Sequence, residues 1–361
     1  MPEMTKRERL VCALSREEPD TVPIYDLVDH RGILSKFGGE ELTLANAQEV
    51  VPRALSKVLD TTRVWLPEAL GRRVDSRGFV YERGEWFNEW NVAQPYQGRS
   101  GLLQFVKTDI EQLDAWRPTP AQDPLAETRA WQQKFGDTVL PATMAGEALT
   151  DCAILIGIEE FVYLEADEPD LVWRWVDAHH AKTLRRLQSE ADCASISPIS
   201  WTFADCAYKQ HLMFSKGFLK SHGFFQRLAD IMAVLHSFGL KNIFHSDGDI
   251  YTIIPELIQS GVDALAPIDT GAGLDLAALK AEFGHQVSFV GGIDLGLLSS
   301  GTPAEVRGAT LRALQAAGPG GGFVLGSSSE EIYDTVPEEN ILSMWDTTRE
   351  YGRYPIHIPE I

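Results

Sequence analysis

Three side chains that can bind a metal or transfer a proton follow a single apolar run. Residues 243–249 read IFHSDGD, in which an apolar start typical of a buried strand leads into His245, Asp247 and Asp249. Imidazole nitrogens and carboxylate oxygens are zinc ligands and also general acids or bases. His245 and Asp247 are two residues apart, so both can point to the same side of an extended backbone. The structural alternative is that Asp247 caps the next helix and His245 bonds to backbone.

More acids stand directly after other apolar runs, and any of them could instead be a turn or cap residue. These positions are Asp26, Glu147, Asp269, Asp294 and the segment 327–330. A catalytic zinc needs three protein ligands and an open position, so the histidine and aspartate above require a third ligand. Glu330 is the predicted third ligand, and Glu147 is the alternative third ligand. If Glu147 does not bind the metal, we predict that it is a catalytic residue. Asp26 and Asp294 are predicted to contact the substrate.

The elements that must position these residues follow a βα rhythm. Short β-branched runs alternate with amphipathic helical patterns from about residue 137, and VPIYDL (22–27) adds an early strand. The predicted later strands are 137–145, 194–200, 241–245, 262–268, 286–294 and 321–329. Seven or eight buried strands with intervening helices, after an N-terminal helical segment, predict a (β/α)8 barrel whose active site lies at the carboxyl ends of the strands. A doubly wound sheet is the alternative, but no GxGxxG opens a helix after the first strand.

Residues of about 60 to 115 interrupt this rhythm. RRVDSRGFVYERGEWFNEWNV has the turn signals and alternation of antiparallel hairpins. We predict an insertion near the barrel mouth, within a single domain that spans residues 1–361. Its tryptophans, Trp65, Trp86 and Trp90, either pack a small core or line a ligand pocket.

Composition limits the classes of partner. The formal charge of −20 argues against nucleic acid, because phosphate binding needs clustered Lys and Arg. No apolar run is long enough to span a membrane, and the charged N-terminus lacks a signal peptide's apolar stretch, so we expect a cytoplasmic protein. The four cysteines are widely spaced, which excludes an all-cysteine zinc site.

Several segments together resemble one known family. IFHSDGDIYTIIPELIQSGVDALAPID, FVGGIDLGLLSSGTPAEVR, GGFVLGSSS and VPEENILSMWDTTREYGRYP resemble the uroporphyrinogen decarboxylase superfamily, and MTKRERLVCALSREEPDTVPIYDL is similar to its non-decarboxylase branch. The resemblance covers nearly the whole chain, is strongest from residue 214 onward, and implies a (β/α)8 barrel. True decarboxylases of the family hold substrate carboxylates with an RQAGRY-like segment, where this chain has YDLVDHRGILSKFGG with Arg31 alone.

The other branch consists of zinc-dependent methyltransferases that pass a methyl group to or from the cobalt of a corrinoid protein. Its thiol-methylating members bind zinc through His-x-Cys where this chain has His245-Ser246-Asp247, and through a second cysteine in the region of 327–330. Replacement of both cysteines implies a harder, oxygen-rich site. The resemblance therefore implies an aryl methyl ether O-demethylase component that takes methyl from a methoxylated aromatic with zinc as Lewis acid.

Other expectations follow from the same resemblance. The corrinoid would be carried by a separate protein, because no Asp-x-His-x-x-Gly occurs in this chain, and a homodimer is compatible with the family. Asp205, in FADCAYKQ, matches the superfamily and implies substrate binding or general acid catalysis, with Tyr208 beside it; a structural loop role is the alternative. Two other functions stay open: a metal-free lyase that decarboxylates a small aromatic or pyrrolic acid, and a barrel that binds a ligand without catalysis.

Overall fold

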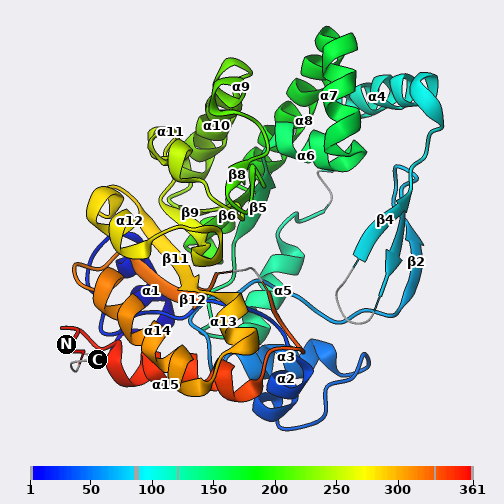
Figure 1. Ribbon diagram of the computed structural model, residues 1–361. Coiled ribbons are helices and arrows are strands. Elements are labelled where there is room, and N and C mark those ends of the chain that lie inside the picture. The colour runs from blue at the N-terminus through cyan, green and yellow to red at the C-terminus, as the bar shows by residue number, and fades with distance from the viewer. Residues whose placement is uncertain (1–2, 85–88, 120–121, 329–330, 359–361) are drawn as a thin grey trace.

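A ring of parallel strands forms the centre of the molecule (Figure 1). The computed structural model describes residues 3–84, 89–119, 122–328 and 331–358. Six strands are hydrogen-bonded in the order β12-β11-β10-β9-β6-β5. Their bounds are β5 Thr143–Gly146, β6 Ile199–Phe203, β9 Lys241–His245, β10 Ala264–Ile268, β11 Ser288–Ile293 and β12 Phe323–Ser327.

Two very short segments close this sheet into a barrel. Ile24 bridges in parallel to Leu325 of β12, and its neighbour Tyr25 bridges to Thr61. Thr61 in turn bridges to Val139, which precedes β5. The described residues therefore form a closed ring of eight parallel segments, and the predicted (β/α)8 barrel is confirmed. The segment at Thr61 was not predicted as a strand, because the sequence signal there is only a few residues long.

Helices surround the ring and cover its outer face (Figure 1). α14 and α15 pack against each other and lie, with α12 and α13, on the side of the late strands. The helices are α1 Lys6–Leu14, α2 Arg31–Gly38, α3 Ala47–Leu55, α4 Gly98–Ala115, α5 Ala126–Phe135, α6 Ala148–Ile156, α7 Ile158–Asp167, α8 Pro169–Ser189, α9 Lys216–Ser221, α10 Phe224–Ser237, α11 Ile254–Gln259, α12 Leu276–Phe283, α13 Leu295–Ser300, α14 Pro303–Ala317 and α15 Glu338–Tyr351. None of those described is long and apolar enough to cross a membrane.

The barrel interior is a separate apolar cluster beneath the candidate site. Tyr25, Trp201, Ile243, Val290 and Val324 are buried there together with Leu10, Ala13 and Leu14 of α1. Side chains on a strand alternate between its two faces, so residues 199, 201 and 203 of β6 point inward, as do residues 243 and 245 of β9. The N-terminal helix thus closes the amino end of the barrel. His245 is the last inward residue of its strand, at the opposite end.

The predicted hairpins are confirmed as a three-stranded antiparallel sheet in the order β2-β3-β4. It consists of β2 Gly71–Val74, β3 Val80–Arg83 and β4 Glu89–Ala93. The sheet stands apart from the barrel, beside the long α4 and α8 (Figure 1). Trp90 is 50% exposed on it, Trp65 is partly buried and lines a small pocket, and Trp86 lies outside the described residues.

Candidate active site

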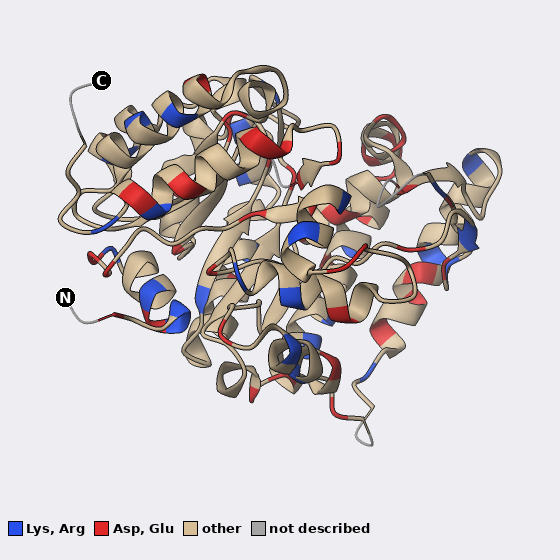
Figure 2. Ribbon diagram, turned by 90° about the horizontal axis from the view of Figure 1, so that it is seen from below, with Lys and Arg blue, Asp and Glu red and all other residues tan. Residues whose placement is uncertain are grey.

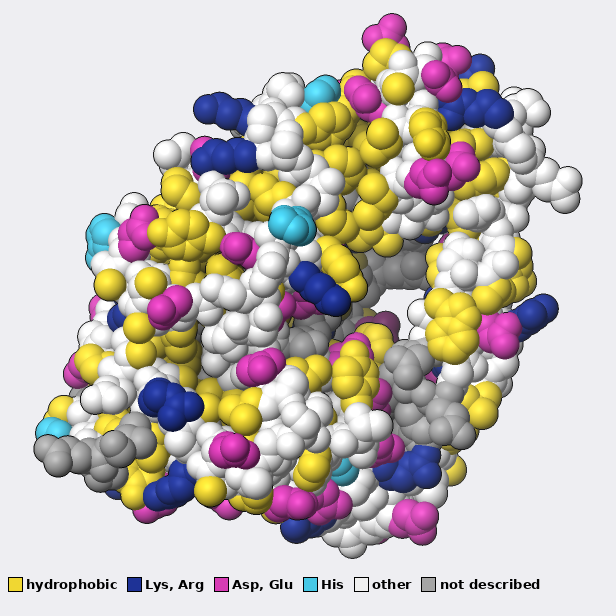
Figure 3. Space-filling view, viewed as in Figure 1, with side chains coloured by type: hydrophobic (Ala, Val, Ile, Leu, Met, Phe, Trp, Pro, Cys, Tyr) yellow, Lys and Arg dark blue, Asp and Glu magenta, His cyan; other side chains and the backbone are white. Residues whose placement is uncertain are grey.

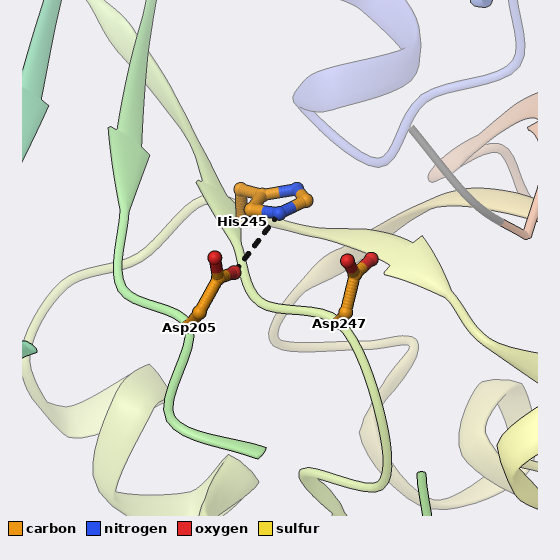
Figure 4. A group of neighbouring side chains, drawn as sticks. All are labelled: Asp205, His245 and Asp247. Carbon is orange, nitrogen blue, oxygen red and sulfur yellow. Dashed lines mark ion pairs between the residues drawn. The ribbon is translucent and has the colours of Figure 1, made fainter. Parts of the chain in front are cut away.

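Asp205, His245 and Asp247 come together at the carboxyl ends of β6 and β9 (Figure 4). One ligand atom from each residue lies within 4.8 Å of the others, and the Asp205 Oδ1 to His245 Nε2 distance is 3.2 Å. The imidazole is buried, whereas 46% of the Asp205 side chain is exposed. The histidine therefore forms the floor of the group, and carboxylates form its rim.

The register of the parallel sheet and the next residue, Ser246, hold the group together. Phe203 of β6 pairs with His245, and the two rings lie 5.4 Å apart. Ser246 donates its backbone N–H to Ala266 of β10, which fixes the chain beyond β9. Its Oγ accepts a hydrogen bond from the backbone N–H of Cys206 at 3.2 Å. The small buried serine thus ties the loop that carries Asp205 to the loop after β9.

Gly248 permits a close approach of the same two loops. Its φ is +80°, a left-handed conformation that favours glycine. A Cβ at this position would lie 2.9 Å from the backbone oxygen of Lys209 and 3.0 Å from the nitrogen of Tyr208. The N–H of Asp249 donates to that Lys209 oxygen at 2.6 Å. The 205–209 loop therefore lies directly on the glycine next to Asp247.

Glu147 has a well-defined structural task in the folded chain. One carboxylate oxygen accepts the N–H groups of Leu149 and Thr150 and so caps α6. The other accepts the Arg227 guanidinium at 2.8 Å. Burial raises the pKa of this fully buried carboxyl, against the opposing charge of the arginine. Glu147 is outside the group formed by Asp205, His245 and Asp247.

Asp151 is a site residue that the sequence did not single out. It lies over Gly146, where a Cβ would be only 2.1 Å from the aspartate's Oδ2. Part of its side chain is exposed. The protein around the carboxyl nevertheless removes enough water to raise its pKa to about 7, and the negative charges of Glu147 and Asp205 raise this pKa further. The four-residue spacing from Glu147 on one helix face is the only sequence signal. That spacing has meaning only once a helix is known to start at the strand tip.

Arg63 was missed because the strand before it was missed. Its guanidinium carbon lies 5.0 Å from the ring centroid of Phe203 and 5.4 Å from that of Trp201. A guanidinium at this distance over an aromatic face is a cation–π contact. It places a positive charge inside the barrel, beside the ring that contacts His245.

Asp26 is fully buried and bonded through both oxygens. Oδ1 accepts the backbone N–H of Ser327, and Oδ2 accepts the indole N–H of Trp345, each at 2.8 Å. Burial raises the pKa of this carboxyl to about 6, although both hydrogen bonds oppose the shift. The aspartate thereby joins the first strand segment to β12 and α15.

Replacing Asp26 by alanine is expected to lower the free energy of unfolding by about 3 kcal/mol, because two buried donors lose their acceptor. The effect should also depend on pH. The folded-state pKa of about 6 exceeds the ordinary value of 3.8, so the folded state holds the proton more tightly, and the carboxyl's contribution to stability falls as pH rises from 4 to 6. Urea unfolding at pH 4 and pH 7 checks this: the cost of the substitution should be larger at pH 4. An equal cost at both pH values would contradict the raised pKa.

The other predicted site residues lie at the rim or outside the described part of the chain. Asp294 caps α13 by accepting the N–H of Gly296 at 3.0 Å. Tyr208 is 67% exposed, with the Lys209 ammonium 5.5 Å from its ring centroid. Substrate contact by these two residues stays a prediction. Glu330, the predicted third ligand, is outside the described residues.

The closed ring and the three clustered ligands define a (β/α)8 barrel with a candidate metal centre at the carboxyl ends of its strands. The family model of uroporphyrinogen decarboxylase (URO-D) matches residues 222–351, a stretch that includes His245 and Asp247. Among solved structures, it is similar to a methyltransferase from Methanosarcina mazei, with 17% sequence identity and a TM-score of 0.67. That similarity covers 97% of this chain and 99% of the other, and it concerns the fold. No curated protein matches in sequence.

Proposed function

We propose that this protein is a methyltransferase that moves a methyl group from a methoxylated aromatic substrate to the cobalt of a separate corrinoid protein. The observation that carries the proposal is the donor set of Asp205, His245 and Asp247 at the carboxyl ends of the barrel strands. Two of these residues lie in the stretch that matches the URO-D family model. The name of the structural neighbour supports methyl transfer as the type of reaction.

The donor set fits zinc. One imidazole nitrogen and two carboxylate oxygens are accepted zinc ligands, and three protein ligands leave a position open for substrate. Ligand atoms in such a site lie about 3.3 Å apart, given metal–ligand distances of about 2.0–2.2 Å. The Asp205 Oδ1 to His245 Nε2 distance is already 3.2 Å, and all three ligand atoms lie within 4.8 Å of one another, so small side-chain movements would bring the set to this spacing. If Glu330 is the third ligand instead, Asp205 is left to contact the substrate.

A bound zinc would act as a Lewis acid toward the ether oxygen that leaves as a phenolate. Around it, the chain's own groups bind, orient and supply protons. Phe203 and Arg63 offer an aromatic and cationic wall beside His245. Asp151, with its pKa near 7, holds a proton that the departing oxygen can take near neutral pH. Glu147 acts as a positioning residue, because it caps the helix that carries Asp151 and its charge raises the pKa of that aspartate.

Methyl transfer can be tested with purified full-length protein, a set of methoxylated benzenes and cob(I)alamin as surrogate for the corrinoid protein. We expect the phenol and methylated cobalt to form in equal amounts, and only when both zinc and cob(I)alamin are present. Omitting either one is the control. Absence of phenol with every substrate would refute the methyl transfer proposal.

A metal-free lyase acting on a small aromatic or pyrrolic carboxylate is the second candidate. It is favoured by the cation of Arg63 within the barrel and by Asp151, whose raised pKa suits proton transfer to a carbon that loses CO2. Release of CO2 from such acids by chelator-treated protein would support the lyase and overturn the zinc-dependent reaction.

A further inference from the structure

A large cleft lies between the inserted sheet and the helices beside the barrel. Its volume is about 920 Å³, and its walls come from the β2–β3 turn, β3, β4, α4 and its C-terminal end, α6 and α8. Figure 3 shows the hollow between the body of the molecule and the part of the chain that stands apart from it. Asp151 of α6 belongs to this wall. The cleft therefore adjoins the group around His245 but does not coincide with it.

Three cations, Arg77, Lys182 and Arg186, line this cleft together with four acids. Figure 2 shows Lys and Arg interspersed with Asp and Glu along the chain. Arg186 already has partners, because its guanidinium donates a hydrogen bond to Glu190 at 2.7 Å and another to the Met144 carbonyl. Arg77 is held loosely, with its Nε 3.6 Å from Asp75.

Lys182 is the cation that the protein leaves least neutralised. Its ammonium lies 5.8 Å from the ring centroid of Trp116, and within the described ranges it makes no salt bridge. Burial lowers the pKa of this lysine, and the neighbouring charges of Arg77 and Arg186 lower it further against the opposing charge of Asp109. An anion placed between Lys182 and Arg77 would relieve that repulsion.

The four acids of the cleft are largely occupied elsewhere. Glu89 accepts hydrogen bonds from the Arg73 guanidinium at 2.6 and 2.7 Å, and Asp75 Oδ1 accepts the backbone N–H groups of Arg77 and Phe79 at 2.9 Å.

Asp109 is buried and engaged, because its Oδ2 accepts Trp175 Nε1 at 2.7 Å and His179 Nε2 at 3.0 Å. Burial works to raise the pKa of Asp109, but these two hydrogen bonds outweigh it and hold that pKa below its ordinary value. Asp151 is partly protonated near neutral pH, so it carries less than a full negative charge.

The remaining walls are apolar or aromatic. Ile154 of α6 is 54% exposed within the cleft, and Leu155 stands next to it. Trp116, at the end of α4, and Tyr81 of β3 supply aromatic faces. An exposed isoleucine on a wall that also carries cations suits a ligand with an apolar ring and an acidic group.

We propose that this cleft binds the carboxylate of an aromatic acid between Arg77 and Lys182, with the ring against Ile154 and Trp116. The inference rests on the proposed function and deepens it, because it makes the methyl donor a methoxylated aromatic carboxylate. The sheet register supports the connection: Gly146, beneath Asp151, pairs with Phe203, which pairs with His245. Two interstrand spacings place the backbone of Gly146, under the cleft residue Asp151, about 10 Å from that of His245.

Binding can be measured by calorimetry on full-length protein without metal or corrinoid, so the result does not depend on methyl transfer. We compare 4-methoxybenzoate with its neutral analogue 4-methoxybenzyl alcohol, in wild type and in Lys182→Met and Arg77→Met. The matched control is Lys134→Met, since the ammonium of Lys134 lies 5.1 Å from the Trp131 ring centroid, and neither residue lines this cleft. Thermal melting confirms that each variant is folded.

We expect wild type and Lys134→Met to bind the carboxylate at least about tenfold more tightly than the alcohol, a preference worth about 1.4 kcal/mol. Lys182→Met and Arg77→Met should each lose most of that preference. Equal affinity for the two ligands, or an unchanged preference in both cleft variants, would overturn the inference. Binding of inorganic phosphate without binding of the carboxylate would assign the cations to a phosphate ligand and overturn it as well. Carboxylate binding without methyl transfer would leave this inference intact and count against the proposed function alone.

Discussion

Replacing His245 by alanine is expected to release bound zinc and to lower methyl transfer by a factor of about a thousand or more. The imidazole is the buried member of the group and the only nitrogen ligand in it, whereas the two carboxylates stand at the rim. Its loss leaves two oxygens of like charge that repel each other without the third ligand. Elemental analysis of untagged protein should find about one zinc per chain in wild type and much less in the variant.

His180→Ala is the matched control for this substitution. His180 is also a buried histidine in contact with a carboxylate, since its Nε2 lies 3.2 Å from Asp230, but it belongs to α8 and not to the strand tips. We expect this variant to keep its zinc and its activity, with at most a loss of stability. Zinc retained in His245→Ala, or lost equally in both variants, would contradict the assignment of the metal centre.

The architecture of the barrel was predictable, because it depends on signals that each strand–helix unit of the chain carries. Buried strands alternate with amphipathic helices from β5 onward, and parallel strands place all their carboxyl ends at one edge. The sequence alone therefore places His245 and Asp247 at that edge. The strand segment at Thr61 lacked such a signal, because it forms only isolated bridges, and Arg63 was lost with it.

Side-chain partners were not predictable, because they depend on how loops pack. In the sequence, Glu147 and Asp26 follow strands in the same way as His245 and Asp247 do. In the structure, Glu147 caps α6 and binds Arg227, and Asp26 accepts hydrogen bonds from two buried donors. Conversely, Asp205 and His245 are 40 positions apart in the sequence, and the path of one loop brings them into contact. A carboxylate's neighbours decide its task, and those neighbours come from other parts of the chain.

Gly248→Ala is expected to weaken zinc binding about 10–100-fold, as is typical when a group that orients metal ligands is disturbed. The new methyl group would meet the Lys209 backbone oxygen at 2.9 Å, so the two loops must move apart and carry Asp205 away from Asp247. A non-glycine residue at φ +80° also costs about 1–2 kcal/mol of stability in itself.

Gly239→Ala separates these two effects. Gly239 has φ +81°, nearly the same as Gly248, but a Cβ there would meet nothing within 4 Å. Both variants should lose similar backbone energy in denaturant unfolding, whereas competition with a chromophoric chelator should show weaker zinc binding in Gly248→Ala alone. Equal zinc affinity in the two variants would mean that the contact between the 205–209 loop and Gly248 does not position the ligands. A loss confined to Gly248→Ala would show that the metal centre depends on the close packing of two loops that the sequence alone does not bring together.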